Sequence, residues 1–206
     1  MSKELHYFDV PALAEHIRYI LSYTKQEFKD VRYDYSTWPD QKIKDSLPYG
    51  QFPLYKEGDR VLTQSFAIAR YVSTGTELMP TDPWEQALAD SIVGTILDYW
   101  GNVRGIIIEK DPKKRADMKK KLIEEKIDYY FSRFEKKLKD NGGYFLGKLS
   151  WADFALCGFV EASNVFMDIQ VDNNYPAVKA IKEKIKNSPG VKEHIAARGP
   201  YNIPKF

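Results

Sequence analysis

The sequence has little cysteine, no long apolar run and almost no net charge. Its single cysteine, Cys157, cannot form an intramolecular disulfide, so a disulfide-stabilised secreted domain is not expected. No apolar run approaches the roughly 18 residues of a transmembrane helix, and the first residues lack the apolar core of a signal peptide. The 31 basic residues nearly balance 29 acidic ones, which argues against a nucleic-acid or membrane surface. We therefore expect a cytoplasmic protein.

Apolar residues are present in sufficient number for a buried core, at 43% of 206 residues. A segment with one glycine and two prolines, GTELMPTDP at 75–83, has no periodicity and separates two parts of different pattern. We predict a first domain over 1–75, a linker over 76–82 and a second domain over 83–206.

The first part alternates between strand and helix patterns. It predicts, in order, a strand, a helix, a strand, a polar loop with at most one helical turn, a hairpin and a helix, at 5–8, 12–21, 28–33, 35–48, 54–63 and 65–73. Such an order favours an α/β domain with a mixed four-stranded sheet.

The second part has helical periodicity throughout. Predicted helices cover 84–109, 112–138, 154–166, 176–187 and 189–197. Ser150 and Asp153 have the spacing of a capping box and precede a nearly all-apolar helix, which is typical of the centre of a bundle. The second domain is therefore predicted to be an all-α bundle.

The segment 49–67, YGQFPLYKEGDRVLTQSFA, contains a strand edge with unpaired backbone groups and, after it, the start of a helix. Pro53 cannot donate a hydrogen bond to a sheet, and the bond before it is a candidate for the cis form. The backbone of Phe52 is then free, while Ser65 begins a helix whose N–H groups can hold an anion. The backbone of Phe52 can pair with a short peptide-like ligand, and the helix start at Ser65 can hold the carboxylate of that ligand.

Five motifs together carry a family resemblance, in this order along the chain: LHYF, Trp38, PYGQFPL, LTQSFAIARYV and SWADF. In these the chain resembles cytosolic glutathione transferases, and most closely the Sigma class. The resemblance implies a thioredoxin-like N-terminal domain, an all-helical C-terminal domain, and a homodimer with one glutathione site per subunit. It also implies a glutathione transferase that activates the thiol for attack on hydrophobic electrophiles or organic hydroperoxides, with no metal and no cofactor beyond glutathione as co-substrate.

The resemblance also assigns roles to individual residues. Tyr7 would be catalytic, donating a hydrogen bond to the glutathione sulfur, and Asp98 would reach the glutathione of the partner subunit. The remaining glutathione contacts would be Trp38, Lys42, Gln51, Phe52, Pro53, Gln64 and Ser65. The acceptor pocket would be formed by Phe8, Leu13, Trp100, Arg104, Phe159 and Phe206.

Two alternatives remain within the same resemblance. The family includes prostaglandin D synthases, which carry an arginine and a tryptophan where this chain has Leu13 and Gly105, and metal-binding acids where it has Gly94 and Leu97. An isomerase of that type is the first alternative. A non-catalytic, crystallin-like structural or ligand-carrying protein is the second, although the candidate glutathione residues would have no purpose in it.

Overall fold

A computed structural model describes residues 2–38, 40–201 and 203. The first part of the chain forms a four-stranded sheet with three helices. Its strands are β1 (Lys3–Phe8), β2 (Lys29–Tyr33), β3 (Leu54–Glu57) and β4 (Arg60–Thr63), and its helices are α1 (Glu15–Tyr23), α2 (Gln41–Ser46) and α3 (Ser65–Ser73).

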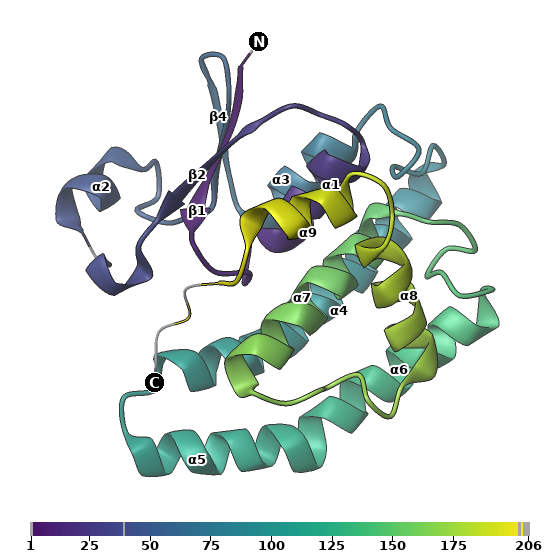
Figure 1. The fold of residues 1–206 in the computed structure, drawn as a ribbon. Helices are drawn as coiled ribbons and strands as arrows, with labels where there is room; N and C mark the ends of the chain where they lie inside the picture. Colours follow the sequence, from purple (N-terminus) through teal and green to yellow (C-terminus); the bar gives the residue numbers. More distant parts are fainter. Residues whose placement is uncertain (1, 39, 202, 204–206) are drawn as a thin grey trace.

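The sheet is mixed, as predicted, with the strand order β2-β1-β3-β4. β1 runs parallel to β2, so the chain must cross over through α1, while β3 is antiparallel to both β1 and β4. The predicted hairpin is confirmed by the pairing of Leu54 with Thr63 and of Glu57 with Arg60. Figure 1 shows α1 and α3 on the side of the sheet that faces the second part of the chain, and α2 on the other side.

The second part is helical. Its helices are α4 (Pro83–Ile108), α5 (Pro112–Lys121), α6 (Ile127–Asp140), α7 (Trp151–Met167), α8 (Pro176–Lys186) and α9 (Val191–Arg198). A π-helical turn, Leu122–Lys126, joins α5 to α6, where the sequence predicted one uninterrupted helix. Within the described residues, none of these helices is long and apolar enough to span a membrane.

α7 is the central helix, and its start follows the predicted capping box. The Asp153 carboxylate accepts hydrogen bonds from the backbone N–H of Ser150 at 2.8 Å and of Phe145 at 3.0 Å. Because these N–H groups are buried, the carboxylate satisfies donors that the fold would otherwise leave unpaired. Nearly every side chain of α7 is buried, as an all-apolar helix in a bundle should be.

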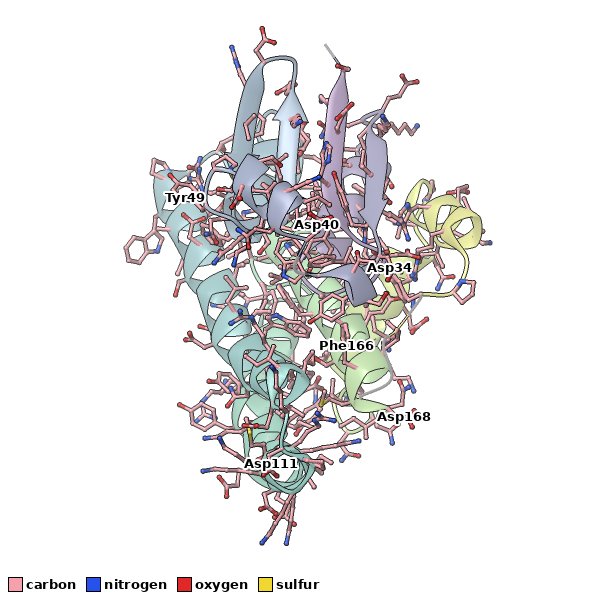
Figure 2. The ribbon with its side chains drawn as sticks, turned by 90° about the vertical axis from the view of Figure 1, so that its left-hand side faces the viewer. Asp34, Asp40, Tyr49, Asp111, Phe166 and Asp168 are labelled. Atoms are coloured by element: carbon pink, nitrogen blue, oxygen red, sulfur yellow. The ribbon has the colours of Figure 1, made fainter. Side chains whose placement is uncertain are left out.

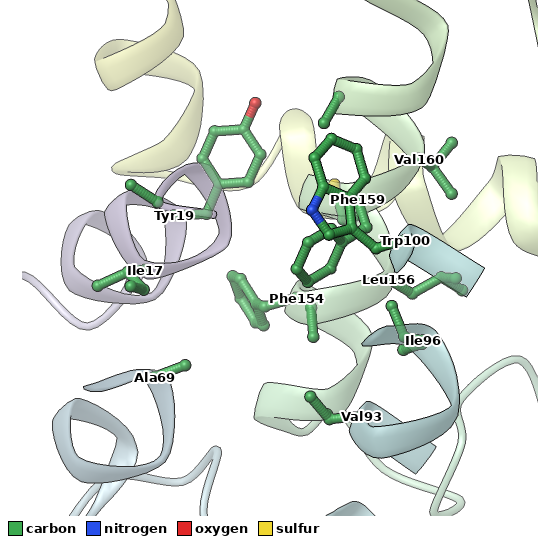
Figure 3. Close-up of a cluster of buried hydrophobic side chains, with 14 of the residues drawn as sticks. Ile17, Tyr19, Ala69, Val93, Ile96, Trp100, Phe154, Leu156, Phe159 and Val160 are labelled. Carbon is green, nitrogen blue, oxygen red and sulfur yellow. The ribbon is translucent and has the colours of Figure 1, made fainter. Parts of the chain in front are cut away.

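The core lies where α1, α4 and α7 meet, and α3 closes it from the sheet side. Figure 3 shows Ile17 and Tyr19 of α1 opposite Phe154 and Phe159 of α7, with side chains of α4 and α3 around them. α1 and α7 approach so closely that a Cβ atom at Gly158 would lie 2.8 Å from the Cβ of His16. The sheet and the helical part therefore share one continuous packed interior.

Three local predictions need correction. α1 begins at Glu15 rather than at 12, because the chain first makes a turn in which Ala12 has φ of +28°. The polar loop contains both a 3₁₀ turn (Tyr35–Thr37) and α2, which begins with the Asp40 carboxylate accepting from the Ile43 N–H. α9 begins at Val191, after Gly190 with φ of +84°, rather than at Pro189.

Candidate functional site

A cavity of about 820 Å³ lies between the sheet and the helices α4 and α7. Its wall combines the end of β1 and the turn after it, the loops around α2, the segment before β3, and the start of α3. From the helical part come one face of α4 and the end of α7. Figure 2 labels two of the lining residues, Tyr49 in the loop before β3 and Phe166 on α7. This volume lies within the range of small-molecule sites in proteins.

Tyr7 lies in the wall of this cavity, near the end of β1, and only 4% of it is exposed. Its hydroxyl oxygen accepts a hydrogen bond from the backbone N–H of Leu13 at 3.2 Å. Burial raises the pKa of Tyr7 to about 12, although the Leu13 N–H and the nearby Arg18 and Arg104 oppose the rise. The phenol therefore keeps its proton at neutral pH. Because Leu13 occupies an acceptor position of the oxygen, the O–H hydrogen is free to donate into the cavity.

Arg18 of α1 fixes the turn that brings Leu13 to Tyr7. Its fully buried guanidinium donates to the carbonyl oxygen of Val10 at 3.1 Å and of Phe8 at 3.3 Å. The carboxylates of Glu15 and Asp30 pair with it at 3.0 and 3.1 Å. Since the charges are paired and hydrogen-bonded, the arginine can stay buried while it holds both carbonyls.

The Phe52–Pro53 segment presents free backbone to the cavity. The bond between the two residues is cis, as the sequence suggested, and Pro53 directly precedes the inner strand β3. Among the described residues, no other backbone group pairs with the N–H or C=O of Phe52. Its ring is buried against Tyr33, with ring centroids 4.7 Å apart, and against Phe8 at 5.4 Å. The aromatic packing therefore holds the free backbone groups in place.

The start of α3 is a candidate anion site, and the residue that caps this helix differs from the prediction. Gln64 rather than Ser65 is the N-cap residue, and it adopts φ of +71° without a side-chain hydrogen bond to the helix. Ser65 is the first helical residue, is buried, and lines the cavity with Gln64. The first backbone N–H groups of α3 have no partner within the helix, so they are free to bind a carboxylate.

The structure brings Lys44 rather than Lys42 to the cavity. Both lie on α2, but Lys42 is exposed and is not part of the cavity wall, whereas Lys44 lines it. Residues two apart on a helix point in different directions, so only one of the two can face the cavity. Lys44 is therefore the candidate at this position, together with the predicted Trp38 and Gln51, which also line the cavity.

The predicted acceptor residues divide into three groups. Phe8, Leu13, Trp100 and Arg104 line the cavity as expected. Phe159 does not: it lies behind Trp100, with ring centroids 5.3 Å apart, and is fully buried in the core (Figure 3). Phe206 lies outside the described residues. Lining residues that the sequence analysis missed include Tyr35, Leu97, Ile107, Ile108 and Phe166.

Known proteins are similar to this chain over most of its length. A family model described as the N-terminal domain of glutathione S-transferase matches residues 3–74, and one described as its C-terminal domain matches residues 98–198. A Drosophila melanogaster protein, glutathione S-transferase S1, is 32% identical over 96% of this chain and 79% of its own length. The chain belongs to the glutathione S-transferase family.

Two further similarities are to prostaglandin D synthases. The hematopoietic prostaglandin D synthase of Gallus gallus is 30% identical over 95% of this chain and 96% of its own length. A solved structure of prostaglandin synthase D from Nilaparvata lugens superposes with a TM-score of 0.91, at 31% identity, over 97% of this chain and 100% of that one. The glutathione S-transferase fold predicted from the sequence is thereby confirmed.

Asp98 is the one predicted glutathione residue of α4, and it lies outside the cavity of its own chain. Leu97 and Trp100 line that cavity, whereas Asp98 is exposed and lines a second cleft of about 350 Å³ with Gly101, Asn102 and Gly105. Asp98 therefore does not contribute to the wall of its own chain's large cavity. Among the described residues, no three His, Cys, Asp or Glu side chains form a group that could hold a metal ion.

Proposed function

We propose that this chain is a Sigma-class glutathione transferase that acts in the cytoplasm as a homodimer and detoxifies hydrophobic electrophiles. The observation that carries the proposal is the buried Tyr7 hydroxyl, whose lone pair is occupied by Leu13 and whose hydrogen is free in the cavity. Glutathione is the only co-substrate that the proposed chemistry needs.

Glutathione fits the polar side of the cavity. Its γ-glutamyl carboxylate would lie at the start of α3 beside Gln64 and Ser65, and its cysteinyl part would pair with the free backbone of Phe52. The glycyl carboxylate would lie near Trp38 and Lys44. This placement leaves the sulfur beside Tyr7, at the border with the apolar side.

Tyr7 would then stabilise the thiolate. A free thiol has a pKa of about 8.5, and a hydrogen bond to the charged form lowers that value. The thiolate sulfur bonds to the electrophilic carbon while a leaving group departs or a proton adds elsewhere. With an organic hydroperoxide, the sulfur instead attacks oxygen and releases an alcohol, and a second glutathione resolves the oxidised sulfur to the disulfide and water.

The substitution Tyr7→Phe tests the proposal. Conjugation at neutral pH should fall about 10²-fold, because one donor to the charged sulfur is lost. The pKa of bound glutathione, followed by thiolate absorbance, should return towards about 8.5. Glutathione affinity should change little. Tyr55→Phe is the control, since Tyr55 is buried in the same sheet but does not line the cavity.

Full turnover by Tyr7→Phe, with an unchanged thiol pKa, would remove the role given to Tyr7. Retention of the wild-type protein on immobilised glutathione without conjugation or peroxidase activity would instead favour a carrier or an isomerase. The isomerase is the second candidate because a solved prostaglandin synthase is so similar in fold. Failure to bind glutathione at all would favour a structural, crystallin-like role.

A further inference from the structure

The cavity wall contains two cationic side chains and no carboxylate. Lys44 comes from α2 and lines the cavity near Tyr49, Gly50 and Gln51. Arg104 comes from α4, on the helical side. No aspartate or glutamate is among the described residues that line the cavity, so nothing in this wall neutralises either charge. A cavity of this kind favours ligands with more than one anionic group.

Arg104 is unpaired within the part of the chain that the structure describes. It is exposed, and it has no ion pair and no hydrogen bond to another described residue. Other arginines are engaged: Arg70 pairs with Asp90 at 3.0 Å and Arg198 with Glu161 at 2.6 Å. The guanidinium of Arg104 therefore has its full set of donors available for a planar anion such as a carboxylate.

Arg104 also interrupts an otherwise apolar face of α4. Leu97, Trp100, Ile107 and Ile108 line the cavity from the same helix, at spacings of three and four residues from one another or from Arg104. Phe166 of α7 adds a further aromatic side chain to this wall. A ligand lying along it would bury an apolar body and meet one positive charge.

Glutathione does not account for Arg104. In the proposed placement, its two carboxylates are taken by the start of α3 and by Lys44, and both lie on the sheet side of the cavity. We propose that Arg104 binds an anionic group of the acceptor, so that the preferred acceptors are hydrophobic electrophiles that carry a carboxylate. This inference rests on the proposed function and specifies its second substrate.

An acid with an α,β-unsaturated ketone illustrates the class. The thiolate sulfur forms a bond to the β-carbon, the electrons of the double bond move to the α-carbon, and a proton from solvent adds there. No group leaves, and nothing is oxidised or reduced. Arg104 would hold the carboxylate while the apolar body rests on the α4 face, which positions the β-carbon at the sulfur.

The test compares two acceptors that differ in one group, 4-phenylbut-3-en-2-one and its para-carboxylate. The measured quantity is the ratio of kcat/KM for the carboxylate to kcat/KM for the neutral ketone. Wild-type protein should prefer the carboxylate. Arg104→Met should lower the ratio about 10-fold to 100-fold, because a charge-assisted hydrogen bond is lost, and Arg104→Lys should lower it less. Added salt should also lower the wild-type ratio.

Lys113→Met is the matched control, since it removes one positive charge from an exposed position of α5 that does not line the cavity. Its ratio should equal that of the wild type. Any effect of Arg104 on the thiolate through Tyr7 changes kcat/KM for both acceptors by the same factor, so it cancels in the ratio. A ratio that Arg104→Met leaves unchanged, or a wild-type preference for the neutral ketone, overturns this inference alone. Failure to conjugate either acceptor overturns the proposed function with it.

Discussion

Gln64 adopts a backbone conformation that suits glycine better than glutamine. Its φ of +71° and ψ of 115° lie outside the regions that side chains with a Cβ atom prefer, a conformation that costs about 1–3 kcal/mol. The residue stands at the start of α3 and lines the cavity. The strain is therefore placed where the Gln64 amide can contact a ligand at the helix N-terminus.

Two substitutions of Gln64 separate the effect of its backbone strain from the effect of its side-chain amide. Gln64→Ala keeps a Cβ atom at positive φ and loses the amide, whereas Gln64→Gly loses both. We expect both variants to bind glutathione about 10-fold more weakly, because each lacks the amide contact. Gln64→Gly should be about 1 kcal/mol more stable than Gln64→Ala, measured by urea unfolding, because glycine relieves the strain.

Equal stability of the two variants would show that the loop relaxes and stores no strain. Unchanged glutathione affinity in both would remove Gln64 from the proposed site. Calorimetric titration with glutathione supplies the affinities, and Gln41→Ala, an exposed glutamine of α2 outside the cavity wall, serves as the control for both measurements.

At the residue scale, short sequence motifs selected residues that the structure brings together at one cavity. Tyr7, Phe52 and Ser65 were found because each belongs to a short motif, and the structure places all three at one cavity. Lys42 was predicted and Lys44, which lines the cavity, was not, because no described side chain of α2 is buried and the spacing therefore could not indicate the orientation of the helix. Arg18 was missed because its partners are backbone carbonyl oxygens, those of Val10 and Phe8, and no side-chain pattern indicates such contacts.

At the scale of elements, the contact between α1 and α7 positions the turn that carries Leu13. His16 and Gly158 meet where the helices are closest, and the His16 ring stacks on Phe159 with centroids 5.0 Å apart. α1 begins two residues after Leu13, whose N–H donates a hydrogen bond to the Tyr7 hydroxyl. Any displacement of α1 from α7 is therefore transmitted to the hydrogen bond between the Leu13 N–H and Tyr7.

Gly158→Ala should weaken both stability and catalysis. Alanine favours a helix over glycine by about 1 kcal/mol, so a helix without close neighbours would become more stable. At position 158, however, the added Cβ would lie 2.8 Å from the backbone nitrogen of His16, and we expect a loss of about 1–3 kcal/mol. Conjugation should fall as Tyr7 and Leu13 separate.

Gly94→Ala in α4 is the control, because an added Cβ there meets no atom within 4 Å. It should raise the free energy of unfolding by about 0.5–1 kcal/mol and leave conjugation unchanged. If Gly158→Ala also stabilised the protein in urea unfolding, the two helices would be free to separate, and the proposed link between α7 and Tyr7 would be lost.

The helices could be predicted from the sequence where their residues follow a clear apolar pattern. α7 and its capping box were found because burial imposes a nearly continuous apolar run and because the cap is local. α2 was underestimated because five of its six residues are polar and no described side chain in it is buried. The π-helical turn between α5 and α6 has no compositional signal, since Leu122–Lys126 continues the helical pattern.

At the scale of the whole molecule, a buried ionic cluster joins the two parts of the chain. Glu15 of α1 pairs with Arg18 at 3.0 Å, with His194 at 3.2 Å and with Arg198 at 3.3 Å, and the last two belong to α9. Burial alone would raise the pKa of Glu15, but these three partners lower it to about 2. Because Glu15 and His194 are 179 residues apart, no local pattern could have indicated the cluster.

The proposed homodimer makes the placement of Asp98 testable. Asp98 lies outside the cavity of its own subunit, so it can act on glutathione only from the partner subunit. Tyr7→Phe and Asp98→Asn should each impair conjugation when present in both subunits. In a hybrid of one Tyr7→Phe subunit and one Asp98→Asn subunit, one site would then carry both changes and the other site neither.

Mixing the two variants under conditions of subunit exchange should therefore restore activity. Equal amounts give hybrids as half of all dimers, so about a quarter of all sites regain both groups and the activity should approach about a quarter of the wild-type value. If Asp98 served its own subunit, each site would retain one defect and mixing would restore nothing. Mixing Tyr7→Phe with a Tyr7→Phe, Asp98→Asn double variant is the control, since no arrangement of these subunits contains an intact site.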